Sequence, residues 1–232
     1  MNKNENGAQY IWDEQNRLNQ RAHPSGLGTI EIGKLPDKNF KDQVIEDYLL
    51  AISSEINECQ ENCYWKHWSS EAKNGKRFQL INPDGESGEG TAQNVYVEII
   101  DIGFFLVSIL QTAGLDLEVW SKEWEKNWDI LQKKESVNNP KDPECMRNLC
   151  NINMRLLGET TTLLLATENQ KTSACNTAIK NYIGACDAIG LNHTDIINLY
   201  KQKLKKNHER MDRGRKQVGD TLAAIECAEV KK

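Results

Sequence analysis

The stretch VYVEIIDIGFFLVSILQTA, residues 95–113, decides the fold class of this chain. Only Glu98 and Asp101 interrupt its apolar character, and its length predicts a helix over residues 94–113 with most of its surface buried. The longest apolar runs of the chain are too short for a membrane span and contain a charge, so we expect no transmembrane segment. The stretch therefore indicates the core helix of a globular protein.

Apolar residues recur at helical spacing along most of the remaining sequence, and no segment shows the alternation of a strand. We predict an all-α fold that forms a single domain over residues 1–232. Its core helices are expected at about 8–21, 40–68, 94–113 and 194–213, with an inserted lobe at about 115–190. The helix at 40–68 should bury a stripe that includes Val44, Tyr48 and Ile52. Three tryptophans at four-residue spacing in the lobe are expected to pack: Trp120, Trp124 and Trp128.

Composition excludes several classes of function. Hydrophobic residues make up 38% of the chain and charged residues 27%, as in a soluble globular protein. The formal net charge of −5 argues against nucleic-acid binding, which usually needs a basic domain. The seven cysteines form no CxxC pair, so we expect reduced thiols and no zinc site. The first residues lack the apolar stretch of a signal peptide, and a cytoplasmic protein is expected.

Two pairs of acids, each at a three-residue spacing, are candidate metal ligands. Glu55 and Glu58 share one helical face, as do Glu98 and Asp101, because a three-residue step is close to a full turn. Chance alone gives about five such pairs with 34 acids in 232 positions, so context must decide. Glu98 and Asp101 lie in an apolar helix, where buried carboxylates need a cation or hydrogen bonds. Magnesium and a structural salt-bridge network are both consistent with this pattern.

Four blocks of the sequence resemble the dimeric dUTPases, a family of the all-α NTP pyrophosphatase superfamily. The blocks stand in the family's order: EQNRLN (14–19), EINE (55–58) followed by WKHW (65–68), EIID (98–101) followed by Phe105 and Ser108, and YKQKLKKNHERMDRG (200–214). The loops at 69–93 and 133–145 match no part of that pattern. The resemblance implies a multi-helix pyrophosphatase fold and a homodimer.

The resemblance also implies a reaction. The family hydrolyses dUTP to dUMP and pyrophosphate with Mg²⁺, and dUDP is a further expected substrate. The implied metal ligands and catalytic groups are Glu55, Glu58, Glu98 and Asp101. One of the first two carboxylates would orient the attacking water, and attack at the α-phosphorus would release pyrophosphate.

The resemblance assigns the substrate contacts as well. The implied phosphate ligands are Lys203, Asn207, Arg210 and Lys216. The implied nucleoside contacts are Gln15, Asn19, Trp68, Phe105 and Tyr200. Gln15 and Asn19 would lie near the base, and Phe105 would pack on the deoxyribose and disfavour a 2′-hydroxyl. Trp65 and Trp68 are also consistent with packing anchors, so a wall beside the nucleotide is one of two interpretations.

Two departures from the family pattern leave the base undecided. The family carries a histidine three residues after the last acid, where it helps to read the base, and this chain has Phe104. The family's C-terminal GYKxG pattern appears only as GRKQVG, residues 214–219. A preference for dCTP, or a broader dNTP pyrophosphatase, is therefore an alternative to dUTP. An alternative of another class is a non-catalytic helical binding protein, against which the intact spacing of the four acids argues.

Overall fold

A computed structural model describes residues 7–132 and 138–213, and within these ranges the chain is a set of helices joined by loops. The helices are α1 (Gly7–Ala22), α2 (Thr29–Gly33), α3 (Lys38–Glu61), α4 (Ala92–Thr112), α5 (Leu117–Gln132), α6 (Pro143–Leu165), α7 (Glu168–Ala188) and α8 (His193–Asp212), with a short π-helix at Ala72–Lys76. None of the described residues forms a strand, and the predicted all-α class is confirmed.

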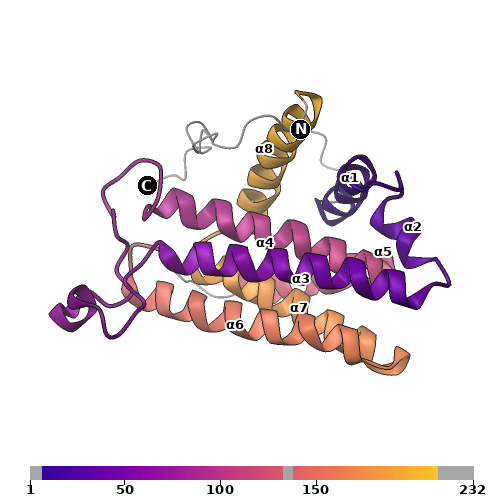
Figure 1. Ribbon diagram of the computed structural model, residues 1–232. Helices are drawn as coiled ribbons and strands as arrows, with labels where there is room; N and C mark the ends of the chain where they lie inside the picture. The colour runs from indigo at the N-terminus through magenta and orange to yellow at the C-terminus, as the bar shows by residue number, and fades with distance from the viewer. Residues whose placement is uncertain (1–6, 133–137, 214–232) are drawn as a thin grey trace.

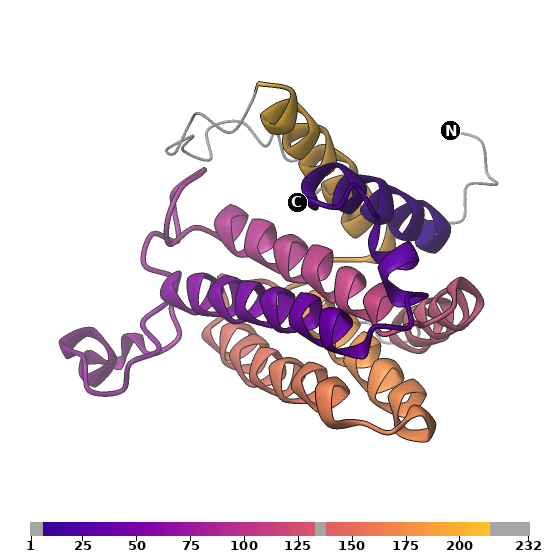
Figure 2. The ribbon, with the colours of Figure 1, turned by 45° about the vertical axis from the view of Figure 1, so that its right-hand side comes forward.

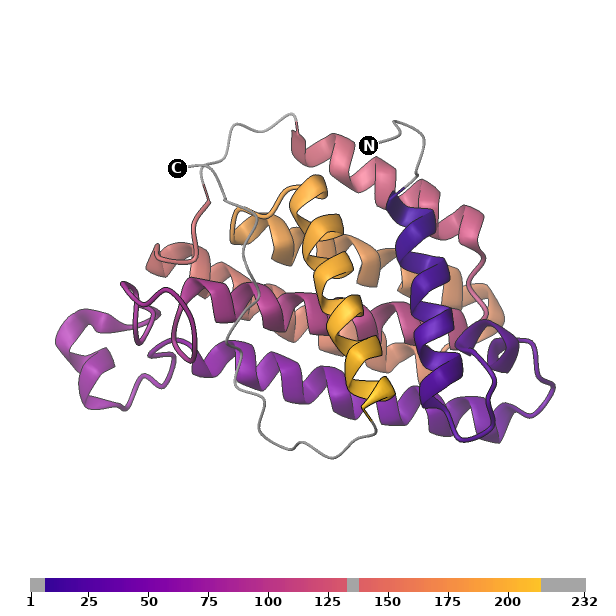
Figure 3. The ribbon, with the colours of Figure 1, turned by 90° about the horizontal axis from the view of Figure 1, so that it is seen from above.

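The helices are arranged in layers around α4. Helices α3 and α4 lie side by side and run in opposite directions, so the end of α3 meets the start of α4 (Figure 1). On one side, α6 packs along α3, while α7 packs against α4 and α5 (Figure 2). On the other side, α1 and α8 cross α4 (Figure 3). Side chains of α4 therefore face neighbours in every direction.

Helix α4 is a core helix, as the sequence predicts. It is long and apolar enough to cross a membrane, but 83% of its most apolar window is buried inside the protein. Gly103 allows α7 to approach it closely, because a Cβ atom there would overlap the Tyr182 hydroxyl and lie 2.6 Å from its Cζ. At the far end, Gly114 takes a φ of 86° and ends the helix.

The segment predicted as an inserted lobe forms α5, α6 and α7. These helices share one continuous core with α3 and α4. The three tryptophans of α5 are buried, with ring centroids of successive pairs 4.9 and 6.0 Å apart, so their predicted packing role is confirmed. The division of residues 1–232 into a core and a lobe stays a prediction.

Helix α3 ends at Glu61, whereas the sequence analysis placed its end near residue 68. The side-chain amide of Asn62 donates to the Glu58 carbonyl (2.9 Å), which stops the helical ladder. The next residues then pair with the returning loop, where Tyr64 N donates to Gln79 O and Phe78 N to Tyr64 O. The loop between α3 and α4 therefore projects beyond the helices and carries the π-helix (Figure 1).

Candidate active site

Three carboxylates meet where α3 and α4 lie side by side. Glu55, Glu58 and Glu98 each offer an oxygen, and these oxygens all lie within 4.8 Å of one another. Glu98 is buried, Glu55 is half-buried and Glu58 is exposed. The antiparallel pairing of the two helices brings together acids that are far apart in sequence, as the resemblance implied. We call these three residues the carboxylate cluster.

Burial makes the carboxylate cluster electrostatically unfavourable without a cation. Loss of solvent raises the pKa of Glu55 above its ordinary value, and the negative charges of Asp101 and Glu98 raise it further. Burial likewise raises the pKa of Glu98, although a hydrogen bond from Glu55 works in the opposite direction. Glu55 and Glu98 therefore hold their protons more tightly than ordinary carboxyl groups in the absence of another positive charge.

Asp101 lies one turn beyond Glu98 and has a different partner. Its Oδ2 accepts from Lys203 Nζ at 2.5 Å, and the two side chains are only 15% and 11% exposed. Burial raises the pKa of Asp101, while the charges of Lys203 and Arg210 oppose that shift. The structure thus brings three of the four predicted ligands together and pairs the fourth with a lysine of α8.

The donor set of the carboxylate cluster suits a hard divalent cation. All three groups supply oxygen, which Mg²⁺ and Mn²⁺ prefer, and the site is open enough on the Glu58 side for water ligands. A divalent ion would displace the protons that burial favours on Glu55 and Glu98 and would balance their negative charges. The residues therefore fit a metal, with Glu55, Glu58 and Glu98 as its ligands and Asp101 within one helical turn.

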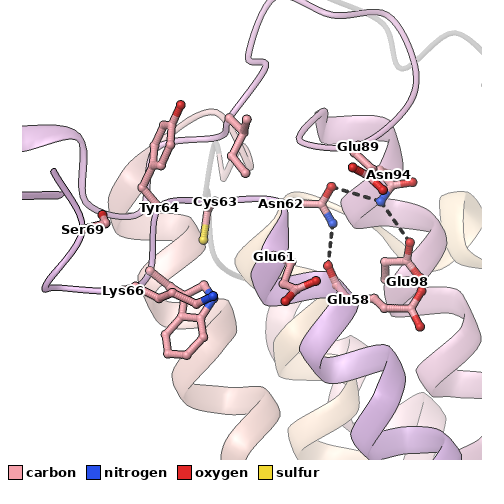
Figure 4. A pocket seen from close by; sticks show the side chains of 12 residues that line it. Glu58, Glu61, Asn62, Cys63, Tyr64, Lys66, Ser69, Glu89, Asn94 and Glu98 are labelled. Carbon is pink, nitrogen blue, oxygen red and sulfur yellow. Dashed lines mark hydrogen bonds between the residues drawn. The ribbon is translucent and has the colours of Figure 1, made fainter. Parts of the chain in front are cut away.

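Two asparagines that the sequence analysis did not single out orient the cluster (Figure 4). Asn94 Nδ2 donates to Glu98 Oε1 and to Asn62 Oδ1, each at 3.0 Å. Asn62 Oδ1 also accepts from Gly90 N at 2.7 Å, which ties the end of the loop to the end of α3. The signal for Asn94 was present in the sequence, because it precedes Glu98 by four residues and so shares its helical face.

Glu58 and Glu98 also line a large cavity under the loop (Figure 4). Its volume is about 530 Å³. Further acids on its wall are Glu61 and Glu89, and Lys66 and Trp65 stand on the side of the loop. We call this space the loop cavity.

A second cavity opens on the other side of the carboxylates, between α1, α4 and α8. Its volume is about 330 Å³, and it is lined by Gln15, Leu18, Asn19, Ala22, Tyr48, Asp101, Phe104, Phe105, Asn207, Arg210 and Met211. We call it the α1–α8 cavity. Most of the residues predicted to contact nucleoside or phosphate thus come together on one wall, although they are spread over three helices.

The amides on this wall are held by a buried polar network. Gln15 Nε2 donates to Ser108 Oγ at 3.0 Å, and Gln15 Oε1 accepts from the Tyr200 hydroxyl at 2.5 Å. Asn19 Nδ2 donates to the same serine at 2.8 Å and to Thr29 Oγ1 at 3.1 Å. Tyr200 therefore stands behind the cavity and orients Gln15 rather than forming the wall itself.

Comparison with known proteins identifies the family of this chain. A family model described as dUTPase matches residues 86–214, which span α4 to α8. The chain belongs to the dimeric all-α dUTPase family. No curated protein matches the chain. The family assignment supports a hydrolase that acts as a nucleotide pyrophosphatase.

The α1–α8 cavity contains the chief departure from the dUTPase pattern. Phe104 takes the place of the family's histidine, and its ring stacks on Tyr200 with centroids 4.2 Å apart and planes at 15°. It is buried and forms part of the cavity wall without a hydrogen-bonding group. Beside it, Phe105 packs against Tyr48, with centroids 6.1 Å apart.

Three further residues, Trp68, Tyr48 and Lys216, remain to be compared with their predicted roles. Trp68 is 58% exposed and lines neither cavity described above, because α3 ends before it and the loop carries it outward. Tyr48, which is predicted in the buried stripe of α3, is half-buried against the core and also lines the α1–α8 cavity. Lys216 and the GRKQVG segment lie outside the described residues.

Proposed function

We propose that this chain hydrolyses dUTP to dUMP and pyrophosphate, with dUDP as a second substrate, and that its active form is a homodimer. The supporting observation is that three of the four predicted acids line one or the other of the two cavities, while Glu55 lies beside Glu58 and Glu98. Asp101 lies on the wall of the α1–α8 cavity, while Glu58 and Glu98 lie on the wall of the loop cavity. A nucleotide whose base entered the first cavity would carry its phosphates to the carboxylates.

In this proposal the α1–α8 cavity holds the nucleoside. Gln15 and Asn19 lie on the wall of this cavity, and their amide oxygens can each accept a hydrogen bond from a pyrimidine edge. Their amide nitrogens already donate within the buried network, Gln15 to Ser108 and Asn19, and Asn19 to Ser108 and Thr29, which fixes their orientation. Phe105 and Tyr48 offer an aromatic surface for the deoxyribose. That surface disfavours a 2′-hydroxyl, because the hydroxyl would lose its water without gaining a partner.

Helix α8 supplies the contacts to phosphate. Arg210 and Asn207 lie on the cavity wall, and the planar guanidinium of Arg210 suits bidentate contact with phosphate oxygens. Lys203 supplies a further positive charge beside Asp101. Charge neutralisation and positioning are the main demands of phosphoryl transfer, and these residues meet both.

The reaction itself is an attack of water on the α-phosphorus. Glu55 or Glu58 holds the water and accepts its proton as the new P–O bond forms. The bond between the α-phosphorus and the oxygen that bridges to the β-phosphorus breaks, and pyrophosphate leaves. Mg²⁺ held by Glu55, Glu58, Glu98 and Asp101 would neutralise the phosphate charge and lower the pKa of bound water.

A pyrophosphate-release assay tests the proposal. The full set of deoxynucleoside and ribonucleoside triphosphates is compared with Mg²⁺ and with EDTA, and dUTP turnover that requires Mg²⁺ is expected. Glu98→Gln keeps the shape of the side chain but removes a charged ligand, and it should lower kcat by at least about a hundredfold. Glu46→Gln, on the exposed side of α3, is the matched control and should behave as wild type. No turnover of any nucleotide would favour the binding-protein alternative.

A preference for dCTP is the second candidate, and Phe104 is the observation that favours it. A phenyl ring cannot donate to or accept from the base edge where the family has an imidazole. Discrimination between uracil and cytosine would then rest on other polar groups of the described cavity wall, such as Gln15, Asn19 and Asn207. A kcat/KM for dCTP well above that for dUTP in the same assay would establish this preference.

A further inference from the structure

Lys203 is the most deeply buried cation beside the carboxylates. Only 8% of the residue is exposed, and its ammonium group contacts Asp101 Oδ2. Its positive charge also acts on Glu98, where it opposes the rise in pKa that burial causes. A buried lysine is stable only with such compensation, because its charged form loses most of its hydration.

Asp101 is correspondingly absent from the carboxylate cluster. The three glutamates have oxygens within 4.8 Å of one another, and the aspartate does not share in that group although it lies one turn away on α4. Asp101 instead pairs with the Lys203 ammonium group, although its negative charge still acts on Glu55 and Glu98. A phosphate that approaches Lys203 therefore competes with Asp101 for the positive charge of the ammonium group.

We propose that Lys203 is an internal counter-cation that occupies Asp101 until a divalent ion and nucleotide bind. Lys203 then leaves Asp101 for the phosphates, and Asp101 becomes available as the fourth metal ligand. Two like charges at one carboxylate repel each other, so the ion and the lysine exclude each other there. This inference rests on the proposed metal site and adds an order to it: the glutamates load first and Asp101 later.

The exchange predicts a change in metal affinity that is opposite to the change expected if Lys203 only supports the fold of the site. If Lys203 competes with the metal, its removal must tighten metal binding in the absence of nucleotide. If Lys203 only supports the fold of the site and its charge does not act on the metal, its removal must leave metal binding unchanged or weaken it. Whether Lys203 also moves away from Asp101 is decided by its nitrogen-15 signal, described below. Turnover falls in both cases, because a phosphate contact is lost, and activity therefore cannot distinguish them.

Mn²⁺ titration without nucleotide, followed by calorimetry and by the electron paramagnetic resonance of the free ion, separates the two. Lys203→Met should bind Mn²⁺ at least about tenfold more tightly than wild type, since a nearby positive charge is gone. Lys203→Arg keeps the charge and should bind as wild type. Lys205→Met, on the exposed side of the same helix, is the matched control and should also bind as wild type. Equal or weaker Mn²⁺ binding by folded Lys203→Met overturns the proposal.

A measurement on the wild-type chain covers the case in which Lys203→Met does not fold. The side-chain ammonium of Lys203 should give a nitrogen-15 signal that is protected from exchange, identified by its absence in Lys203→Arg. Addition of Mg²⁺ with a non-hydrolysable dUTP analogue should shift that signal to the position of a phosphate-bound lysine. A signal that stays unchanged at saturation overturns the exchange. If the wild-type protein hydrolyses dUTP but Lys203→Met does not bind Mn²⁺ more tightly, this inference is refuted and the proposed function stands. If Lys203→Met binds Mn²⁺ more tightly but the wild-type protein hydrolyses no nucleotide, only the proposed function is refuted.

Discussion

At the scale of single residues, the most informative side chain outside the carboxylate cluster is Asn94. Its amide donates to Glu98 Oε1 and to Asn62 Oδ1, so it fixes one carboxylate relative to the end of α3. Asn94→Ala should raise the Mg²⁺ concentration for half-maximal activity by about tenfold or more, as loss of a group that orients a ligand typically does. Asn57→Ala, on the exposed face of α3, should leave it unchanged. Equal metal dependence in both variants would contradict the orienting role.

Phe104 decides the choice of base in a second prediction at this scale. Phe104→His restores a hydrogen-bonding ring on the cavity wall and can keep the stack on Tyr200. The ratio of kcat/KM for dUTP over that for dCTP should rise by about tenfold, since one hydrogen bond to a base edge is gained. Steady-state kinetics with both nucleotides measure the ratio. A parallel fall for both substrates would mean that position 104 serves packing alone.

At the scale of elements, the contact between α4 and α7 depends on one glycine. A methyl group at Gly103 would overlap the Tyr182 side chain, so Gly103→Ala should lower the free energy of unfolding by about 1–3 kcal/mol. Gly158→Ala is the matched control, because it is also in a helix but a Cβ there meets nothing within 4 Å. That change should raise stability by about 0.5–1 kcal/mol. Urea denaturation of both variants checks the opposite signs, and a stable Gly103→Ala would show that α7 moves aside.

The helices differ in how far the sequence could predict them. The sequence predicts α4 closely, because buried residues occur along its whole length and on every face. A segment of that length and apolar character forms a buried helix whichever elements pack around it. The end of α3 was not predicted, since WKHW continues a plausible helical pattern while Asn62 stops the helix through bonds to Glu58 and Gly90. The Glu58 bond is local, but the Gly90 bond depends on a loop that returns from residues far along the chain. Local periodicity contains no information about them.

The same distinction applies to the candidate site. Gln15 and Asn19 reach the cavity because α1 crosses α4, and spacing within α1 alone cannot show this. Only the resemblance placed them near a base. Trp68 has the same aromatic character as Trp65, yet the loop turns one toward a cavity and the other to solvent. The buried faces of the helices thus follow from patterns in the sequence, whereas the helix crossings and the positions of loop side chains depend on the tertiary structure.

At the scale of the whole molecule, the carboxylate cluster links stability to pH. The folded state raises the pKa of Glu55 and Glu98 above the ordinary value of 4.5 because the cluster is buried and acidic. Above that value the unfolded chain has released these protons, whereas the folded chain still holds them. The unfolded state therefore binds fewer protons, and stability must fall as pH rises through the raised pKa values.

The metal-free protein in EDTA should accordingly melt at a lower temperature at about pH 8.5 than at about pH 5.5. The double variant Glu55→Gln, Glu98→Gln cannot ionise at these positions and should lose most of that slope, while other titrating groups contribute equally to both proteins. Added Mg²⁺ should reverse the trend in wild type alone, because the ion binds the ionised carboxylates and so stabilises the folded state most at high pH. Thermal denaturation across the pH range measures all of these effects. The same change of melting temperature with pH in wild type and double variant would mean that Glu55 and Glu98 are not the source of the pH dependence. Their charges would then already be balanced in the metal-free protein by a group other than a metal ion.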